Sequence, residues 1–446
     1  MQLRAAAVEY RVKQHAAILR DNGDTLLPSM GAGVLGFDPA LLSSIAQRVG
    51  TPVYVYSANL IRAQYHALQD ALKDVPHRIC YSVKANGNLG VLRVLKALGA
   101  GADIVSAGEL KRALAAGFDR EGIVFSGVGK TRPELAEAMR VGVGFLNIES
   151  ASELDAVIAA ARDARTQASV GIRVNPDVGA DTHPYTKTGE KTAKFGVPFD
   201  EVVSLARRIA AERSLVLRAL AMHLGSQIHD VEPYSRGTAK LLELVTAIRA
   251  SGIDTLEALD VGGGLGVRYH NEKAPSPQAF AEAVAPKVKA AGLALVCEPG
   301  RYLVANAGVL LTKVLYRKHA GGKEYVVVDA GMTDFVRPSH YNAYHEIVPL
   351  KDGGRPEETV NVVGPICESG DFLALDRKLV TVEPGEYLAL LGTGAYGFVM
   401  SSTYNARPRP PEVLVEGDRY YVARQRETLD DLLRGEVLEP TTWYKA

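Results

Sequence analysis

The segment RICYSVKANGNLGVLRVLKAL, Arg78–Leu98, holds the pattern that decides the fold of this chain. A β-prone, largely apolar run, Arg78–Ala85, is broken by Asn86 and Gly87, and a helical pattern, Leu89–Leu98, follows it. The segment therefore predicts one buried strand followed by one helix. Its only lysine before the helix, Lys84, stands at the carboxyl end of the strand.

The same unit recurs about eight times along the first part of the chain. The predicted strands are Arg78–Ala85, Gly101–Ala107, Gly122–Gly127, Gly144–Ser150, Ala168–Asn175, Leu217–Gly225, Leu256–Gly262 and Ala294–Pro299. The predicted helices include Leu89–Leu98, Ala107–Ala116, Pro133–Val141, Ser152–Ala164, Asp200–Glu212, Tyr234–Ala250 and Pro277–Ala291. This alternation predicts an α/β chain with a (β/α)8 TIM-type barrel. A doubly wound open sheet is the alternative, but no GxGxxG sequence opens a helix near the start.

After Asn306 the pattern changes to apolar β-branched runs separated by Gly, Pro and charged turns. These runs are Val309–Leu315, Tyr325–Asp329, Thr359–Val363, Tyr387–Leu391 and Val413–Val415. They predict a second, mostly β domain of sandwich or barrel type. We therefore divide the chain into a barrel domain, 51–308, and a β domain, 309–446, which the N-terminal segment 1–50 completes.

The composition excludes several classes of function. The 446 residues include 51 Lys+Arg and 51 Asp+Glu, so no net charge favours nucleic acid or an anionic membrane as a partner. Three cysteines, Cys80, Cys297 and Cys367, are too few and too scattered for a disulfide framework or a zinc site, and no metal is expected. No apolar stretch is long enough to span a bilayer, so we expect a cytoplasmic protein in a reducing compartment.

Several polar groups fall at the carboxyl ends of predicted strands, which form the working face of a barrel. Lys84 could be a solvated strand cap, or a Schiff-base nucleophile whose neutral amine is favoured by burial. Gly262, Gly263 and Gly264 could form a plain tight turn, or a backbone cradle for a phosphate. A long insertion, Asn175–Phe199, leaves the same face and is predicted to be an ordered functional loop.

Glu298 and His223 also have two interpretations each. Glu298 could simply pair with Arg301, because a buried carboxylate needs a partner. It could instead face a protonated pyridine nitrogen while Arg301 turns to an anion. His223 could be a core histidine, or it could lie flat against an aromatic ring. One ligand, pyridoxal phosphate, needs a lysine, an anion cradle, an acid and a packing face together.

The chain resembles the fold-type III pyridoxal-phosphate decarboxylases, and among them most closely the diaminopimelate decarboxylases. The resemblance runs from about Thr51 to Asn405. It rests on YSVKAN (Tyr81–Asn86), HLGSQ (His223–Gln227), GGG (Gly262–Gly264), EPGR (Glu298–Arg301), RPSHY (Arg337–Tyr341), CES (Cys367–Ser369) with Asp371, and Tyr396. Each motif is short, but their joint presence in the family's order is specific.

The resemblance implies a role for each matching residue at the cofactor. Lys84 would carry the Schiff base with pyridoxal 5'-phosphate, and Glu298 would keep the ring nitrogen protonated. His223 would stack on the ring. The phosphate would be held by Ser226, by the turn of Gly262, Gly263 and Gly264, and by the backbone of Gly300 and Arg301. Cys367 would donate the proton, since a thiol titrates near enough to neutrality to do so; a buried structural cysteine is the alternative.

The resemblance also implies the substrate and the reaction. The family removes one carboxyl group from meso-2,6-diaminopimelate to give L-lysine and CO2, the last step of lysine biosynthesis. Arg301, Arg337 and Tyr341 would hold the carboxylate of the non-reacting end, which suits the planar fork of arginine. Glu368 would meet its ammonium, and Tyr396 would contact cofactor and substrate. A solvated surface charge is the alternative for Arg337.

The family's active site is shared across a two-fold homodimer, with the Cys367–Glu368 segment reaching into the partner barrel. His340 departs from the family, which more often has an apolar residue there. Three other functions stay open: a relative acting on another amino acid with a distal carboxylate or carrier group, an alanine-racemase-like enzyme, and a catalytically inactive regulatory homologue. The motifs at Glu298 and Cys367 argue against the second, and the joint retention of Lys84, Glu298 and Cys367 argues against the third.

Overall fold

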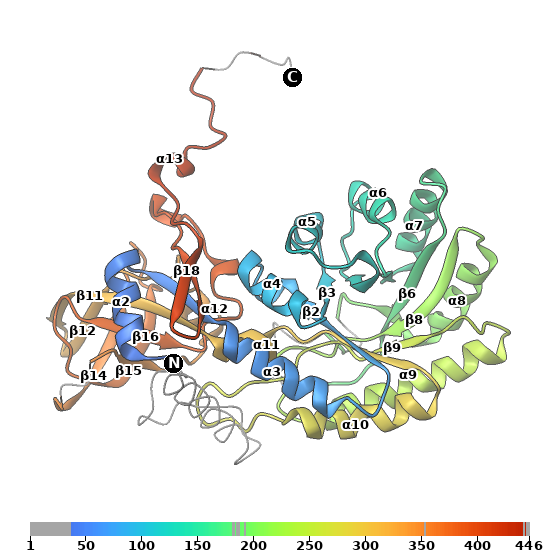
Figure 1. Cartoon of the computed structure of the whole chain (residues 1–446), viewed down its shortest axis with the longest axis horizontal. Helices are drawn as coiled ribbons and strands as arrows, with labels where there is room; N and C mark the ends of the chain where they lie inside the picture. Colours follow the sequence, from blue (N-terminus) through green and yellow to red (C-terminus); the bar gives the residue numbers. More distant parts are fainter. Residues whose placement is uncertain are drawn as a thin grey trace, which may run out of the picture.

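The computed structural model describes residues 37–180, 183, 188–190, 193–351, 354–439 and 442. It contains two nine-stranded sheets that share no strand (Figure 1). One sheet closes on itself as a barrel surrounded by helices, and the other is a mixed sheet at the opposite end of the molecule.

Eight parallel strands form the barrel. They are β2 (His77–Ser82), β3 (Gly101–Ile104), β4 (Ile123–Phe125), β5 (Phe145–Ile148), β6 (Ala168–Asn175), β8 (Leu215–Ala221), β9 (Ala258–Asp260) and β10 (Ala294–Cys297), with the short β7 (Val197–Pro198) beside β6. The neighbour order is β5-β4-β3-β2-β10-β9-β8-β6, and pairing of β5 with β6 closes the ring. This confirms the predicted (β/α)8 barrel, and each of the predicted strands overlaps one of these eight.

Helices alternate with the barrel strands and cover the outside of the barrel (Figure 1). They are α3 (Ala58–Ala71), α4 (Leu89–Ala97), α5 (Ala107–Ala116), α6 (Arg132–Val141), α7 (Ala151–Asp163), α8 (Val202–Ala211), α9 (Glu232–Ala250) and α10 (Pro277–Ala290). Their starts are set by side-chain caps such as Ser106, Ser150 and the capping box of Thr131 with Glu134. Helix α3, which precedes the first barrel strand and lies against α4 and α10, was not predicted from the sequence.

The second sheet gathers strands from both ends of the chain. They are β1 (Val53–Ser57), β11 (Gly308–Ala320), β12 (Lys323–Val328), β13 (Ile347–Pro349), β14 (Glu357–Val363), β15 (Phe372–Val380), β16 (Tyr387–Leu391), β17 (Glu412–Glu416) and β18 (Arg419–Arg424). Strand β1 runs antiparallel to β11 and parallel to β17. Residues 53–57 therefore lie in the second sheet, although the sequence-based division places them in the barrel domain; β13, β15 and β18 were not predicted.

Strand β1 lies between two apolar cores because its side chains alternate. Tyr54 and Tyr56 join the large core that includes the barrel, whereas Val53 and Val55 face the other way. There they meet helix α2 (Pro39–Val49), whose Leu42 and Ile45 are fully buried. Residues 37–50 thus pack on the second sheet; the rest of the N-terminal segment, 1–36, lies outside the described residues.

Three short helices complete the described chain: α11 (Arg301–Val304) follows the last barrel strand, α12 (Arg337–Tyr341) follows β12, and α13 (Leu429–Leu432) follows β18. None of the helices in the described ranges combines the length and the apolar character that crossing a membrane requires.

We expect Ile45→Ala to lower the free energy of unfolding by about 2–5 kcal/mol, because it leaves a cavity between α2 and the second sheet. Chemical denaturation followed by circular dichroism would measure the loss. The matched control is Gln47→Ala on the exposed face of the same helix, which should change stability by less than about 0.5 kcal/mol. Equal losses in the two variants would contradict this packing.

Candidate active site

Lys84 lies just beyond the end of β2, in a single 3-10 turn, Val83–Ala85. Its Nζ is 2.5 Å from Oδ2 of Asp103, which belongs to the neighbouring strand β3. The Ser82 hydroxyl donates to the same oxygen at 2.8 Å. About one third of the Lys84 side chain is exposed, 33%, whereas the Asp103 side chain is fully buried. The lysine is therefore held at the mouth of the barrel by a carboxylate inside it.

Three buried acids, Asp103, Asp260 and Glu298, act on one another, and Asp103 and Glu298 also act on this lysine. Burial, and then the charges of Asp103 and Asp260, raise the pKa of Glu298 well above its usual range. Burial also raises the pKa of Asp260 to about 6. One oxygen of Asp103 and one of Asp260 have no hydrogen-bond partner among the described residues. The cluster thus favours a second positive charge placed against Glu298, which would lower the pKa of that carboxyl group.

The same acids reverse the expectation for Lys84. Burial lowers the pKa of Lys84, but Asp103 and Glu298 act in the opposite sense, and the net shift is upward. Burial thus acts in the predicted direction, towards the neutral amine, but the neighbouring carboxylates outweigh it. The reason is the short contact with Asp103, a residue of the next barrel strand that the sequence does not mark as a partner.

His223 follows β8 and is held as a neutral imidazole. Its Nδ1 accepts a hydrogen bond from the Gly263 N–H at 3.1 Å, so the proton of the neutral ring lies on Nε2. Burial, and then Arg173 and Lys84, lower the pKa of His223 well below its usual range. An uncharged ring at this position can pack flat on an aromatic ligand without repelling a cation beside it.

The three glycines after β9 are required by close backbone packing. A Cβ on Gly262, Gly263 or Gly264 would lie 2.0–2.2 Å from a backbone oxygen of a neighbouring segment. Two of their N–H groups already have protein acceptors: Gly262 donates to Asp260 and Gly263 to His223. A phosphate cradle here remains a prediction, and within this turn it rests on Gly264, whose N–H donates to none of the described residues.

Two buried arginines, Arg301 and Arg337, lie close to the Tyr269 ring, with guanidinium-to-centroid distances of 5.9 and 5.5 Å. Arg301 donates to the Tyr269 hydroxyl at 2.8 Å and to Ser226 Oγ at 3.0 Å, and its Nε has no partner. Burial lowers the pKa of Arg337. Neither guanidinium pairs with a carboxylate in the described part of the chain. Two unneutralised buried cations form a site for an anion.

Tyr396 joins this arginine pair to the lysine. Its N–H donates to Ala85 O at 2.8 Å, and its ring lies 4.8 Å from the Arg301 guanidinium. Its backbone has φ 55°, a left-handed conformation that costs about 1–3 kcal/mol for a residue other than glycine and is concentrated at functional sites. Asn86 Nδ2 donates to Gly394 O at 2.9 Å, so the loop of the second sheet docks directly on the Lys84 segment.

Cys367 and Glu368 are not brought to this cluster. Both are exposed, in the loop between β14 and β15. The loop is nevertheless ordered, because Asp371 accepts hydrogen bonds from Ile366 N and Met332 N, each at 2.6 Å. The alternative of a buried structural cysteine is therefore wrong for Cys367. Tyr341 is half-buried, and its ring contacts the ring of the exposed His340 at 4.5 Å.

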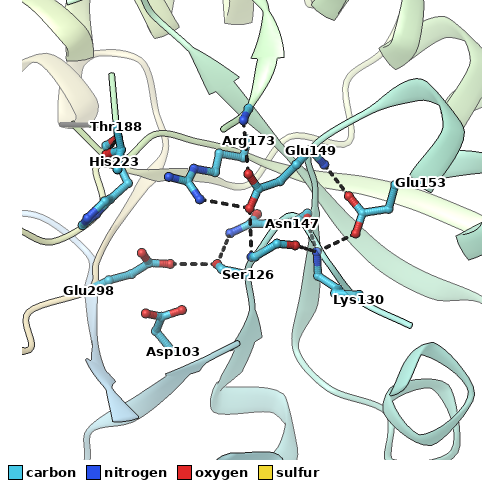
Figure 2. Close-up of polar contacts among 12 residues, drawn as sticks. Asp103, Ser126, Lys130, Asn147, Glu149, Glu153, Arg173, Thr188, His223 and Glu298 are labelled. Carbon is cyan, nitrogen blue, oxygen red and sulfur yellow. Dashed lines mark hydrogen bonds and ion pairs between the residues drawn. The ribbon is translucent and has the colours of Figure 1, made fainter. Parts of the chain in front are cut away.

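A polar network continues from Glu298 across the barrel interior (Figure 2). Glu298 Oε1 is 3.3 Å from the Ser126 hydroxyl, which accepts from Asn147 Nδ2 at 3.1 Å. Beyond it lie the buried ion pairs Arg173–Glu149 and Lys130–Glu153. This network was not predicted from the sequence, and neither were Asp103, Asp260 and Tyr269 as site residues. Most of these residues lie at or near the carboxyl ends of barrel strands, a signal that could have found them.

An open cavity of about 330 Å³ leads to Lys84 and is lined in part by Glu109, Arg112, Tyr396 and Met400. Burial raises the pKa of Glu109 to about 7. A larger cavity, of about 580 Å³, lies at the amino ends of the barrel strands, away from Lys84 and the acids. We assign the chemistry to the smaller one, because Lys84 and Tyr396 line it.

The residues present fit pyridoxal phosphate. Glu298, whose pKa is raised by burial and by the neighbouring acids, matches a protonated ring nitrogen, the neutral His223 ring offers a packing face, and Lys84 offers an amine for the aldehyde. In the part of the chain that the structure describes, no group of three or more His, Cys, Asp or Glu is placed to hold a metal ion.

We expect Asp103→Asn to shift the capture of pyridoxal phosphate by Lys84 to lower pH, by about one unit or more. The amine reacts only when neutral, and loss of the adjacent carboxylate lowers the pKa of Lys84. Absorbance and borohydride trapping across a pH series would give the midpoint. Asp119→Asn, at an exposed site, is the control. A midpoint unchanged by Asp103→Asn would show that this contact does not govern the lysine.

Comparison with known proteins agrees with this geometry. Residues 58–305 match the family model of the pyridoxal-binding domain of pyridoxal-dependent decarboxylases. The diaminopimelate decarboxylase of Pseudomonas aeruginosa is 49% identical over 399 residues, which cover 90% of this chain and 96% of that protein.

Two solved structures extend the comparison to the fold. The diaminopimelate decarboxylase of Helicobacter pylori, complexed with L-lysine, has 40% identity and a TM-score of 0.85, covering 88% of this chain and 98% of the other. The enzyme of M. jannaschii, also with L-lysine, has 34% identity and a TM-score of 0.87, covering 94% and 99%. This chain belongs to the diaminopimelate decarboxylases, a family of fold-type III decarboxylases that depend on pyridoxal phosphate.

Proposed function

We propose that this chain decarboxylates meso-2,6-diaminopimelate to L-lysine and CO2, with the matching residues in the roles that the family assigns them. The observation that carries the assignment is the pair of buried, unneutralised guanidiniums, Arg301 and Arg337, next to the Tyr396 loop that docks on the Lys84 segment. A carboxylate that is not lost in the reaction is the ligand that such a pair requires.

The bound cofactor supplies an electron sink for the bond that breaks. Lys84 holds it through its amine, Glu298 holds a proton at its ring nitrogen, and His223 packs on its ring. Ser226, Gly262, Gly263, Gly264, Gly300 and Arg301 are proposed to bind its phosphate. Asp103 keeps the Lys84 ammonium in place until the aldehyde arrives. The loop of Tyr396, held by Ala85 and Asn86, lines the cavity that leads to Lys84.

The non-reacting end of the substrate is proposed to lie against Arg301, Arg337 and Tyr341. The carboxylate of this end would neutralise the charge of the guanidiniums, and its ammonium would pair with Glu368. A diamine-forming substrate would place a lone ammonium against the same cations, which is unfavourable in a desolvated pocket. The H. pylori and M. jannaschii relatives were solved with L-lysine, whose amino-acid end is chemically equivalent to the end proposed here.

A homodimer is proposed because Cys367 and Glu368 lie exposed and apart from Lys84. Exposed apolar side chains also occur near the carboxyl ends of barrel strands and beside the Lys84 cavity, including Val105, Val128 and Val399. A second copy that covers this face would bring its Cys367 thiol to the site, where it donates a proton to the carbon that lost CO2. A cytoplasmic location is proposed from the three free thiols.

Substrate profiling tests the function. The purified enzyme with pyridoxal phosphate should release CO2 from diaminopimelate and not from lysine or ornithine. Arg337→Ala should weaken diaminopimelate binding by about 2–5 kcal/mol, because a desolvated charge pair is broken. Steady-state kinetics would measure this change, and the absorbance of bound pyridoxal phosphate should stay as in the wild type. Preference for ornithine, or an unchanged Michaelis constant and turnover in Arg337→Ala, would overturn the assignment.

Mixed dimers test the shared site. Lys84→Ala and Cys367→Ala chains, each impaired alone, should regain about one quarter of the wild-type activity when their subunits exchange, because half of random dimers carry one intact site. Mixing Lys84→Ala with Arg337→Ala is the control, since both residues act within one chain and no intact site can form. Recovery in the control, or none in the first pair, would refute the proposed sharing.

A further inference from the structure

His345 is fully buried beside the carboxylate-binding arginines, between α12 and β13. Its Nε2 lies 3.3 Å from Arg337 Nε, and its Nδ1 lies 2.9 Å from the backbone oxygen of Leu391. Tyr269 and Phe335 contact its ring edge-on, with centroids at 4.8 and 4.6 Å. The imidazole is therefore fixed on every side, and one of its nitrogens contacts the arginine directly.

The two contacts define the protonation state of this ring. The Leu391 oxygen can only accept, so Nδ1 must carry the proton. Arg337 Nε–H can only donate, so Nε2 must offer its lone pair. A doubly protonated ring would place an N–H against an N–H and a charge against a charge. Burial, and then Arg337, lower the pKa of His345 well below its usual range, in agreement with this geometry.

Among the buried arginines of the described residues, Arg301 and Arg337 have only uncharged hydrogen-bond partners. Arg173, equally buried, is paired with Glu149 at 2.9 Å, and its charge is compensated within the protein. Arg337 instead contacts an imidazole, and no described residue accepts a hydrogen bond from its Nη1 or Nη2. Its guanidinium is thus held in position at Nε while its charge and its other edge remain available.

We propose that His345 is a positioning residue for substrate recognition: it orients Arg337 without neutralising it, so that the substrate carboxylate supplies the missing negative charge. The inference rests on the proposed function, and it adds a requirement that the family motifs do not contain. The group at position 345 must accept a hydrogen bond and must carry no charge. A carboxylate there would occupy the arginine and compete with the substrate.

Two variants separate the acceptor from the charge. His345→Gln keeps a neutral acceptor and a donor in a side chain of similar reach, whereas His345→Glu supplies an anion. His66→Glu makes the same change at an exposed position of α3 and serves as the matched control. Each variant would be loaded with pyridoxal phosphate, whose binding is followed by absorbance. L-lysine binding to the loaded protein would then be measured by calorimetry, without turnover.

We expect His345→Glu to bind L-lysine at least about 30-fold more weakly than the wild type, as when a buried charge pair loses its partner. The Michaelis constant for diaminopimelate should rise in parallel while turnover at saturation changes less. His345→Gln should remain within about threefold of the wild type, less than 1 kcal/mol. Pyridoxal phosphate binding and the melting temperature should match between the two variants, and His66→Glu should leave L-lysine binding unchanged.

Two results would overturn the inference. Equal L-lysine affinity in His345→Glu and His345→Gln would show that the charge at position 345 does not affect binding. A parallel loss of cofactor binding and stability in both variants would show that His345 only packs. These outcomes are distinct from failure of the proposed function, which would appear in the wild type as absence of diaminopimelate turnover.

Discussion

The contact between Lys84 and Asp103 is the interaction on which the rest of the site depends. It places an ammonium at the rim of the barrel and a carboxylate inside it. Asp260 and Glu298 are two more buried acids in the same cluster, so the acids outnumber the lysine. Such an arrangement disfavours the charged form of Glu298, whose pKa is raised by burial and by the neighbouring acids. It becomes favourable when a ligand brings a protonated nitrogen to Glu298. The site is therefore complementary to the charge of its cofactor before the cofactor binds.

The part of the site around the arginines has the opposite imbalance, an excess of positive charge. There the protein leaves two cations, Arg301 and Arg337, surrounded by hydroxyls, aromatic rings and a neutral imidazole. The cluster of buried acids and the pair of buried arginines meet at the Tyr396 loop, which is hydrogen-bonded to Ala85. A molecule with a cationic ring at one end and a free carboxylate at the other satisfies both groups of charges at once.

The sequence contained enough to predict the barrel, because each parallel strand is a short apolar run with a turn at its carboxyl end. It was less informative for β15, in which exposed Asp376 lies beside charged Arg377 and Lys378 and interrupts the apolar pattern. Lys84, His223 and Glu298 were found because they stand in recognisable motifs. Asp103 was not found, because a single acid at a strand end forms no recognisable sequence motif. The direction of the Lys84 pKa shift was missed for the same reason, since it depends on the contact with Asp103 across two strands. The pairing of His345 with Arg337 likewise follows from tertiary packing.

Strand β1 has a consequence for the order in which this chain can fold during synthesis. All five of its residues are buried in the finished protein, and its two neighbours, β11 and β17, begin only at Gly308 and Glu412. A nascent chain therefore leaves the ribosome with an apolar strand that has no sheet to join, while the barrel strands that follow it can pair in sequence. The second sheet closes last around the first strand made, which makes the N-terminal residues of this protein dependent on the completion of its C-terminal ones.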